Sequence, residues 1–376
     1  MSKVLLAAVF VLVLLSGCAG TADIELQAET LSPPPTEAVS APTETSKPTP
    51  EPYWPADAVM REQQYGRTVW TEGRLFFLWE GKIWCYEEET GKCREICEAD
   101  AENNTWLLSA DGGKIWFYRE GMLCSVNTDG EELREIQPTD GTIYAPRAIE
   151  GNIFWFSNSS LRRLNQETET ADTAALLSSH MYILEEAAGA DENWFYYAEM
   201  DSSPDTRQET GKRLQTTIYR VSLSGWGDAE EWLVLPEAAD TNFTVFGKYA
   251  YFIRYLEPEP LEDGSVVRAH NQLYRYDTET EEEVLIADYA CGYWFAESGI
   301  VVLQEDAQGI ERLVFSDPQG NSRELLQVEY DDGTWNVPLG TAGDRLLYAA
   351  RDGSFRLMEL SGDTEEIVFS LPSEAD

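Results

Sequence analysis

Short apolar strands alternate with polar turns from about Tyr53 to the end of the chain. An aromatic-rich apolar strand recurs seven times, at residues 74–79, 114–118, 152–156, 193–197, 249–253, 299–303 and 345–349. The starts of these copies are 40, 38, 41, 56, 50 and 46 residues apart. One four-stranded blade of a β-propeller takes about 40–50 residues. We therefore predict an all-β fold with a single β-propeller, of seven blades, over residues 56–372; six or eight blades remain open.

A second strand follows each aromatic strand and ends in a turn rich in Gly, Asn and Asp. These second strands cover residues 83–86, 123–126, 161–164, 218–221, 273–276, 312–315 and 355–358. A unit of this size cannot bury its aromatic faces alone, whereas blades stacked side by side can. We expect the last strand, 365–369, to close the ring by pairing near residues 67–71. Residues 173–190 are the one helix-like passage, and we interpret them as a connection between blades.

The first 55 residues have a different character. Residues 1–17 hold one basic residue, a short apolar run and small residues, in the order of an export signal. The run is too short to span a bilayer, which needs about 20 apolar residues. Residues 18–55 contain eight prolines, all between Pro33 and Pro55, and favour an extended chain. We predict a disordered linker here; whether it also acts as a spacer stays open.

The end of the signal, Leu15-Ser16-Gly17-Cys18, resembles the bacterial lipobox. This resemblance implies that Cys18 is lipidated and becomes the N-terminus after cleavage, which fixes the protein to the outer face of a membrane. The alternative is a soluble secreted protein with a chance cysteine at this position. We expect an extracytoplasmic, lipid-anchored protein.

The repeated strands also carry a resemblance. The segments Thr217-Ile-Tyr-Arg-Val-Ser-Leu-Ser-Gly225, Gln272-Leu-Tyr-Arg-Tyr-Asp277 and Met122-Leu-Cys-Ser-Val-Asn-Thr-Asp-Gly130 resemble those of bacterial surface lipoproteins. The propeller of those proteins is related to the low-density-lipoprotein-receptor (YWTD-type) propellers and is often labelled a domain of unknown function. The Tyr-Trp-Thr-Asp tetrapeptide itself is absent. The resemblance implies a propeller fold and supplies no catalytic residues.

The net charge and the few cysteines and histidines limit which ligands and catalytic sites the chain can have. The chain has 27 basic and 68 acidic residues, a formal net charge of −41, which repels nucleic acid. Five cysteines follow Cys18, so at least one is unpaired, and Cys85 and Cys93 flank a turn where a disulfide could form. With His180 and His270 as the only histidines, zinc and histidine-dependent catalytic sites are poorly supplied. We predict no catalytic residues, no metal and no cofactor.

Two features remain as candidate sites. Residues 109–116 fit an Asp-box pattern, which we interpret as a hairpin turn. The fourth and fifth copies carry extra residues, 200–216 and 256–271, between their second and third strands. Because both connections would leave the same face of adjacent blades, we predict a partner surface there, although tolerated insertions would look the same. Its charged residues are Asp201, Asp205, Arg207, Arg213, Glu257, Glu259, Glu262, Asp263 and Arg268.

The sequence thus favours an interaction module at the cell surface that binds a protein, a peptide or a glycan. The alternative is an enzyme that acts on glycan or peptidoglycan from a propeller scaffold. With 68 acidic residues, no pair of carboxylates stands out for glycoside hydrolysis.

Overall fold

The computed structural model divides the chain into two units, Met1–Thr49 and Pro50–Asp376. The structure describes only residues of the second unit: 63, 65–99, 108–136, 144–157, 160–176, 181–201, 216–224, 229–235, 239–256, 259–260, 267–268, 270–306, 308–328, 330–331, 334–362 and 364–370. The predicted signal peptide, Cys18 and the linker lie outside these residues. No helix in the described part of the chain is long and apolar enough to span a membrane.

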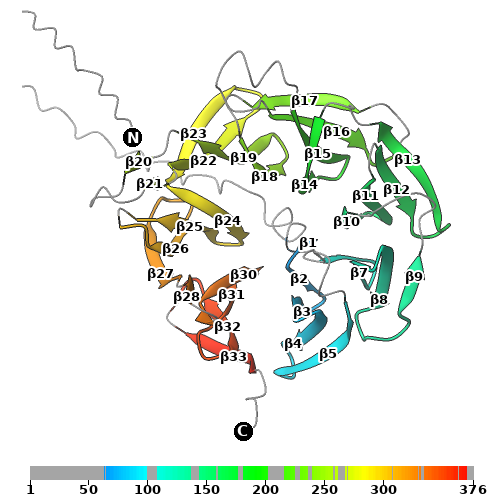
Figure 1. The fold of residues 1–376 in the computed structure, drawn as a ribbon, viewed down its shortest axis with the longest axis horizontal. Coiled ribbons are helices and arrows are strands. Elements are labelled where there is room, and N and C mark those ends of the chain that lie inside the picture. Colours follow the sequence, from blue (N-terminus) through cyan, green and yellow to red (C-terminus); the bar gives the residue numbers. More distant parts are fainter. Residues whose placement is uncertain are drawn as a thin grey trace, which may run out of the picture. The chain divides into compact units, whose positions relative to one another are not determined.

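Seven antiparallel sheets follow one another in a ring, as the sequence repeat predicts (Figure 1). Blade 1 contains β2 (Thr68–Thr71), β3 (Arg74–Trp79), β4 (Lys82–Glu87) and β5 (Lys92–Glu98). Blade 2 contains β6 (Leu108–Asp111), β7 (Lys114–Arg119), β8 (Met122–Asn127) and β9 (Arg134–Ile136). Blade 3 contains β10 (Tyr144–Ile149), β11 (Asn152–Ser157), β12 (Ser160–Asn165) and β13 (Thr170–Leu176). Blade 4 contains β14 (Met181–Ala190), β15 (Trp194–Asp201), β16 (Thr216–Ser222) and β17 (Glu230–Leu235).

The second half of the ring has the same order. Blade 5 contains β18 (Ala239–Phe246), β19 (Tyr249–Tyr255), β22 (Asn271–Asp277) and β23 (Glu282–Asp288). Blade 6 contains β24 (Ala290–Ala296), β25 (Gly299–Glu305), β26 (Glu311–Ser316) and β27 (Ser322–Gln327). Blade 7 contains β30 (Val337–Ala342), β31 (Arg345–Ala349), β32 (Ser354–Glu359) and β33 (Glu365–Ser370). Shorter strands are β1 (Tyr65–Gly66), which pairs with β6, and the hairpins of β20 (Glu259–Pro260) with β21 (Val267–Arg268) and β28 (Tyr330–Asp331) with β29 (Thr334–Trp335).

The first strand of each blade is the innermost, and the fourth is the outermost (Figure 1). Because each blade is an antiparallel meander, its strands alternate in direction. The connections between second and third strands therefore leave on the same side as the links between blades. We name this side the loop face. The turns that join first to second and third to fourth strands lie on the opposite side, the turn face.

The recurrent aromatic strands become the second strands, and their side chains fill the cores between blades. In the core between blades 3 and 4, for example, Phe154 and Phe195 stack with their ring centroids 4.6 Å apart. A buried core of this kind lies at each of the seven blade interfaces. Burial of both faces of each sheet is why the repeat is stable only as an assembly.

The predicted hairpin turn of the Asp-box segment is confirmed. The chain turns at Gly112 and Gly113, both with positive φ, between β6 and β7. The carboxylate of Asp111 accepts hydrogen bonds from Gly151 N at 2.8 Å and from Gln166 Nε2 at 2.7 Å, both in blade 3. The segment thus joins two blades and is structural.

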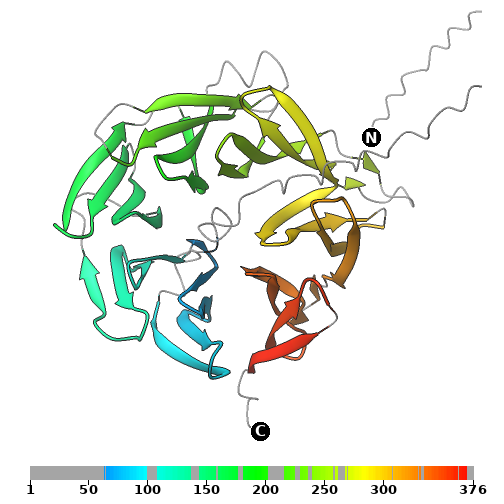
Figure 2. The same ribbon diagram turned by 180° about the vertical axis from the view of Figure 1, so that it is seen from behind.

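Ring closure differs from the prediction. The last strand, β33, pairs with β32 only, and β2 pairs with β3, so no strand is exchanged between blades 7 and 1. The two blades lie side by side in both views (Figures 1 and 2) and share a core of buried apolar residues. Side chains therefore close the ring, because each end of the chain already supplies a complete four-stranded blade.

The helix-like interpretation of residues 173–190 is wrong. The described part of this segment forms the end of β13, to Leu176, and the whole of β14. Its Ala, Leu and Glu residues favour helix only weakly, by a few tenths of a kcal/mol each. Ladder hydrogen bonds to β12 and β15 outweigh that preference.

The structure does not favour the disulfide that we considered possible between Cys85 and Cys93; all five cysteines of the propeller are free thiols in it. In the β4–β5 hairpin Cys85 lies opposite Arg94, whereas Cys93 lies opposite Tyr86. Neighbouring positions of a strand project to opposite faces. Cys85 therefore packs into the core shared with blade 2 and Cys93 into the core shared with blade 7, on opposite faces of the sheet, which does not favour a disulfide.

Candidate functional site

The two long connections leave the loop face of neighbouring blades. One joins β15 to β16 in blade 4, and the other joins β19 to β22 in blade 5. A shared core holds these two blades together. The structure therefore confirms that both insertions lie between second and third strands of adjacent blades.

Few residues of the predicted partner surface fall in the described part of the chain. Asp201 ends β15, while Glu259 and Arg268 lie opposite each other in the β20–β21 hairpin of the fifth-blade connection. The other predicted residues lie outside the described residues: Asp205, Arg207, Arg213, Glu257, Glu262 and Asp263. A role in partner binding stays a prediction for all nine.

A strained tyrosine marks the foot of the fifth-blade connection. Tyr289 links blade 5 to blade 6 on the loop face and has a φ of 54°. The other non-glycine residues with positive φ in the described ranges are all glutamates: Glu72, Glu80, Glu120, Glu132, Glu150, Glu169 and Glu281. A bulky aromatic residue in this region costs about 1–3 kcal/mol, and such strain concentrates at functional sites.

His270 packs on this tyrosine. The two rings stack with centroids 4.6 Å apart and an interplanar angle of 19°. His270 Nε2 lies 3.0 Å from Asp288 Oδ1, and its carbonyl oxygen accepts a hydrogen bond from Leu256 N at 2.8 Å. This backbone bond joins the two ends of the long fifth-blade connection, so the same residue fixes the base of that connection and contacts the carboxylate.

The carboxylate of Asp288 is held in place from several directions. Its Oδ1 also accepts hydrogen bonds from Tyr289 N at 3.1 Å and from Gln272 Nε2 at 3.2 Å. Gln304 of blade 6 donates to the backbone oxygen of Asp288 at 2.7 Å. The Asp288 side chain is nonetheless 46% exposed. It is therefore an oriented anion that solvent, and so a ligand, can reach.

We name His270, Gln272, Asp288, Tyr289 and Gln304 the junction site. A fixed carboxylate beside an aromatic pair is the chemistry that recognises cationic groups and hydrogen-bond donors. The sequence analysis used His270 only to argue against zinc sites and histidine-dependent catalysis. The pairing of His270 with Asp288 depends on the register of β22 and β23, in which Gln272 lies opposite Asp288, and the positive φ of Tyr289 leaves no mark in the sequence.

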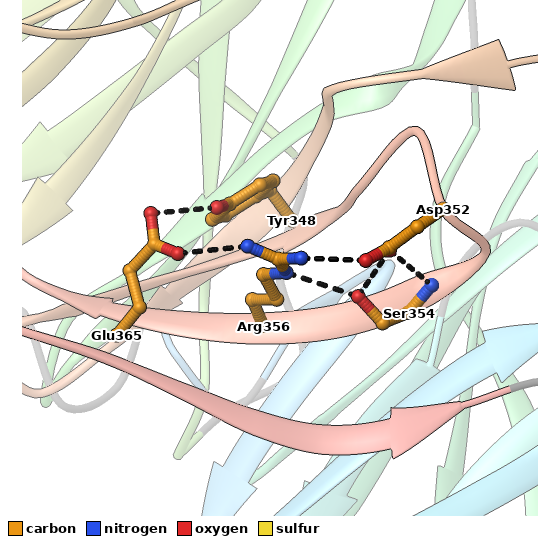
Figure 3. Close-up of polar contacts among 5 residues, drawn as sticks. All are labelled: Tyr348, Asp352, Ser354, Arg356 and Glu365. Atoms are coloured by element: carbon orange, nitrogen blue, oxygen red, sulfur yellow. Dashed lines mark hydrogen bonds and ion pairs between the residues drawn. The ribbon is translucent and has the colours of Figure 1, made fainter.

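A second polar cluster, in blade 7, has a structural role. Arg356 lies between Glu365, whose Oε2 is 3.0 Å away, and Asp352, whose Oδ2 is 2.6 Å away (Figure 3). Tyr348 donates to Glu365 at 2.9 Å, and Ser354 bonds to Asp352. Hydrogen bonds from Ser354, together with Arg356, hold the pKa of Asp352 at about 2.

The ion pair of Arg356 recurs around the ring. In each blade a basic side chain of the second or third strand pairs with an acid of the outermost strand: Lys82–Glu95, Arg119–Glu135, Arg163–Asp172, Arg220–Glu230, Arg254–Glu283, Arg312–Glu324 and Arg356–Glu365. Because this ion pair occurs in every blade, we interpret it as a structural contact that holds the outermost strand to its sheet. Among the described residues no group of three or more His, Cys, Asp or Glu side chains is arranged to hold a metal ion.

Comparisons with known proteins give only distant similarity. No protein-family model matches the sequence, and no curated protein does. Among solved structures, oligogalacturonate lyase from Vibrio parahaemolyticus is 12% identical with a TM-score of 0.48, over 68% of this chain and 74% of that one. Dipeptidyl peptidase 4 of Porphyromonas gingivalis is 9% identical with a TM-score of 0.45, over 80% and 52%. PorZ, a surface component of the type-IX secretion system of the same species, is 14% identical with a TM-score of 0.49, over 82% and 38%. At these identities the likeness concerns the fold alone.

Proposed function

We propose that this chain is an extracytoplasmic lipoprotein, anchored to the membrane through a lipid on Cys18, and that its propeller is an interaction module for a protein, peptide or glycan. The lipobox and the proline-rich linker support the anchoring. The ring supplies a rigid scaffold, and the loop face of blades 4 to 6 supplies the partner surface.

The observation that carries this proposal is the junction site. A strained Tyr289, a stacked His270 and a half-exposed Asp288 meet where the long fifth-blade connection begins and ends. Backbone strain of this kind concentrates at functional sites, and the Asp288 carboxylate is held in one orientation while solvent can still reach it. Asp288 and the net charge of −41 favour a partner group with positive charge, so a basic protein or peptide is preferred to a neutral glycan.

Partner capture tests the surface. The purified propeller would be immobilised and exposed to the proteins and glycans of intact cells, and its bound material would be compared with that of Asp288→Asn. We expect the variant to lose captured material by about tenfold or more, since an ionic hydrogen bond is worth about 1.5–3 kcal/mol. Asp352→Asn is the matched control, because Asp352 also lies on the loop face and its side chain is 55% exposed. Equal capture by all three proteins would reject the surface.

A separate experiment tests the anchor. Cells that express the full chain would be fed a labelled fatty acid, and the label on the protein would be compared with that on Cys18→Ser. We expect label and membrane retention for the unaltered chain only. Label on the variant, or an unlabelled chain that is exported, would contradict lipidation without touching the binding proposal.

A further inference from the structure

Blades 1 and 2 are packed so that the outermost strand of blade 1 follows the third strand of blade 2. On the turn face, a β-carbon placed on Gly130 of blade 2 would lie 3.1 Å from Arg94 Nη1 and 3.6 Å from Ile96 Cδ1 of β5. From there β5 runs to the loop face, where it ends just after Cys97. The third strand of blade 2, β8, starts on the loop face just before Cys124. The two cysteines are therefore at the same level of the interface, and both belong to its core.

One arginine holds the two cysteine-bearing strands together. Arg119 donates to the carbonyl oxygen of Glu98, the residue after Cys97, at 3.4 Å. It also forms an ion pair with Glu135, which lies opposite Cys124 in the sheet of blade 2. Arg119 and the two thiols interact electrostatically with one another. The Arg119 guanidinium thus bridges blade 1 and blade 2 beside both cysteines.

We propose that Cys97 and Cys124 are a disulfide site that covalently links blades 1 and 2 in an oxidising compartment. The oxidant is a disulfide, either a small molecule such as oxidised glutathione or a protein thiol oxidant. One cysteine thiolate attacks the donor disulfide and displaces one thiol; the other cysteine then attacks the mixed disulfide and displaces the second. Two protein S–H bonds are lost, one protein S–S bond forms, and the donor is reduced to two thiols.

The other three cysteines of the propeller do not fit this role. Cys93 faces the opposite core, and Cys291 lies in blade 6. Cys85 shares the core with Cys97 but sits further toward the turn face, beside Arg94. Burial raises the pKa of Cys97 and of Cys124 to about 11, while Arg119 opposes that rise. Because the thiolate is the attacking species, the exchange should quicken as pH rises toward that value.

The link would restrain the unfolded chain between the two cysteines. Closing the chain segment between Cys97 and Cys124 lowers the entropy of the unfolded state. The folded protein is thereby stabilised enough to raise the unfolding temperature by about 5 °C. It would also tie blade 1 to blade 2 independently of the side-chain contacts that close the ring.

Peptide mapping by mass spectrometry tests the proposal. The full chain, purified under reducing conditions, would be incubated with oxidised glutathione at pH 8.5, alkylated without reduction, digested and mapped. We expect one cross-linked peptide pair that contains Cys97 and Cys124, and an unfolding temperature about 5 °C above that of the reduced protein. Cys97→Ser and Cys124→Ser should lose the temperature rise, whereas Cys291→Ser should keep it.

Several outcomes would overturn the proposal. Alkylation or glutathionylation of Cys97 and Cys124 as separate residues after complete oxidation would do so, as would a link of either one to Cys85. Because the mapping uses the unaltered chain, a serine variant that fails to fold does not affect the result.

Discussion

Two interfaces of the ring differ in the residues that they contain: the one between blades 7 and 1, which we name the seam, and the junction between blades 5 and 6. The seam has no shared strand, and its aromatic rings pack closely: Phe77 and Phe355 stack at 5.2 Å, and Trp84 lies 4.4 Å from Phe369. The 5/6 junction also has an apolar core, but on the loop face it adds strained and polar residues, above all Tyr289 and Asp288. Where the ring must hold, the chain buries apolar area; where we propose binding, it keeps an exposed charge.

The largest expected effect is the loss of stability when an aromatic residue is removed from the seam. Phe355 is 1% exposed and contacts Phe77, Trp79 and Phe369. Phe355→Ala should lower the free energy of unfolding by about 3–5 kcal/mol, because it removes transfer energy and leaves a cavity. Chemical denaturation measures this. Leu285→Ala, on the outermost strand and 48% exposed, should change stability by less than about 0.5 kcal/mol. Similar losses for both would mean that the seam is no special point of the ring.

The next effect separates binding from stability at the junction. Tyr289→Asn puts a residue that tolerates positive φ where the tyrosine is strained. The relief of strain offsets the lost ring stacking, so we expect stability to stay within about 1 kcal/mol while partner capture falls at least about tenfold. Thermal unfolding and the capture assay measure the two quantities on the same sample. A stability loss with unchanged capture would make Tyr289 a structural residue only.

The repeat pattern predicted most of this fold because blades are built from local hairpins. The aromatic segment at 74–79 matches β3, and the one at 345–349 matches β31, residue for residue. The innermost strands were harder to predict. Strand β10, for example, reads Tyr-Ala-Pro-Arg-Ala-Ile and has neither alternation nor a long apolar run, because its surroundings come from other blades.

Ring closure and the junction site could not be predicted, for the same physical reason. Both depend on side-chain contacts between different strands and connections: Gln63 with Gly343 at 3.2 Å across the seam, and Gln304 of blade 6 with Asp288 of blade 5 at the junction site. The strand pairing that we expected for 365–369 assumed that a shared sheet closes the ring. The apolar residue Val368 is indeed buried at the seam, but through side-chain packing.

A smaller expected effect is a loss of stability at high pH that comes from Tyr86 at the seam. Burial, together with a 2.6 Å hydrogen bond to Glu366 of blade 7, raises the pKa of Tyr86 to about 12. The hydrogen bond of Tyr86 stabilises the fold fully below pH 10, where Tyr86 is protonated in the folded and in the unfolded state. This stabilisation is lost as the pH rises from 10 to 12, because Tyr86 ionises at a lower pH in the unfolded state than in the folded state. Relative to Tyr86→Phe, the unaltered chain should be about 1 kcal/mol more stable at pH 8 and lose this advantage by pH 12. An unchanged difference in chemical denaturation at both pH values would remove Tyr86 from ring closure.

The smallest effect concerns Asp352, which shares the loop face with Asp288 but is satisfied within its own blade. The folded pKa of Asp352 is held at about 2, below its ordinary value of 3.8. Its stabilising effect is therefore present above pH 4 and lost as pH falls from 4 to 2. Because the side chain is 55% exposed, solvent reduces the contribution to about 0.5 kcal/mol. Asp352→Asn should remove that pH dependence, measured by urea denaturation from pH 5 to pH 2, and leave partner capture intact. If this variant lost capture as Asp288→Asn does, the distinction between a carboxylate that braces a blade and one that meets a partner would fail.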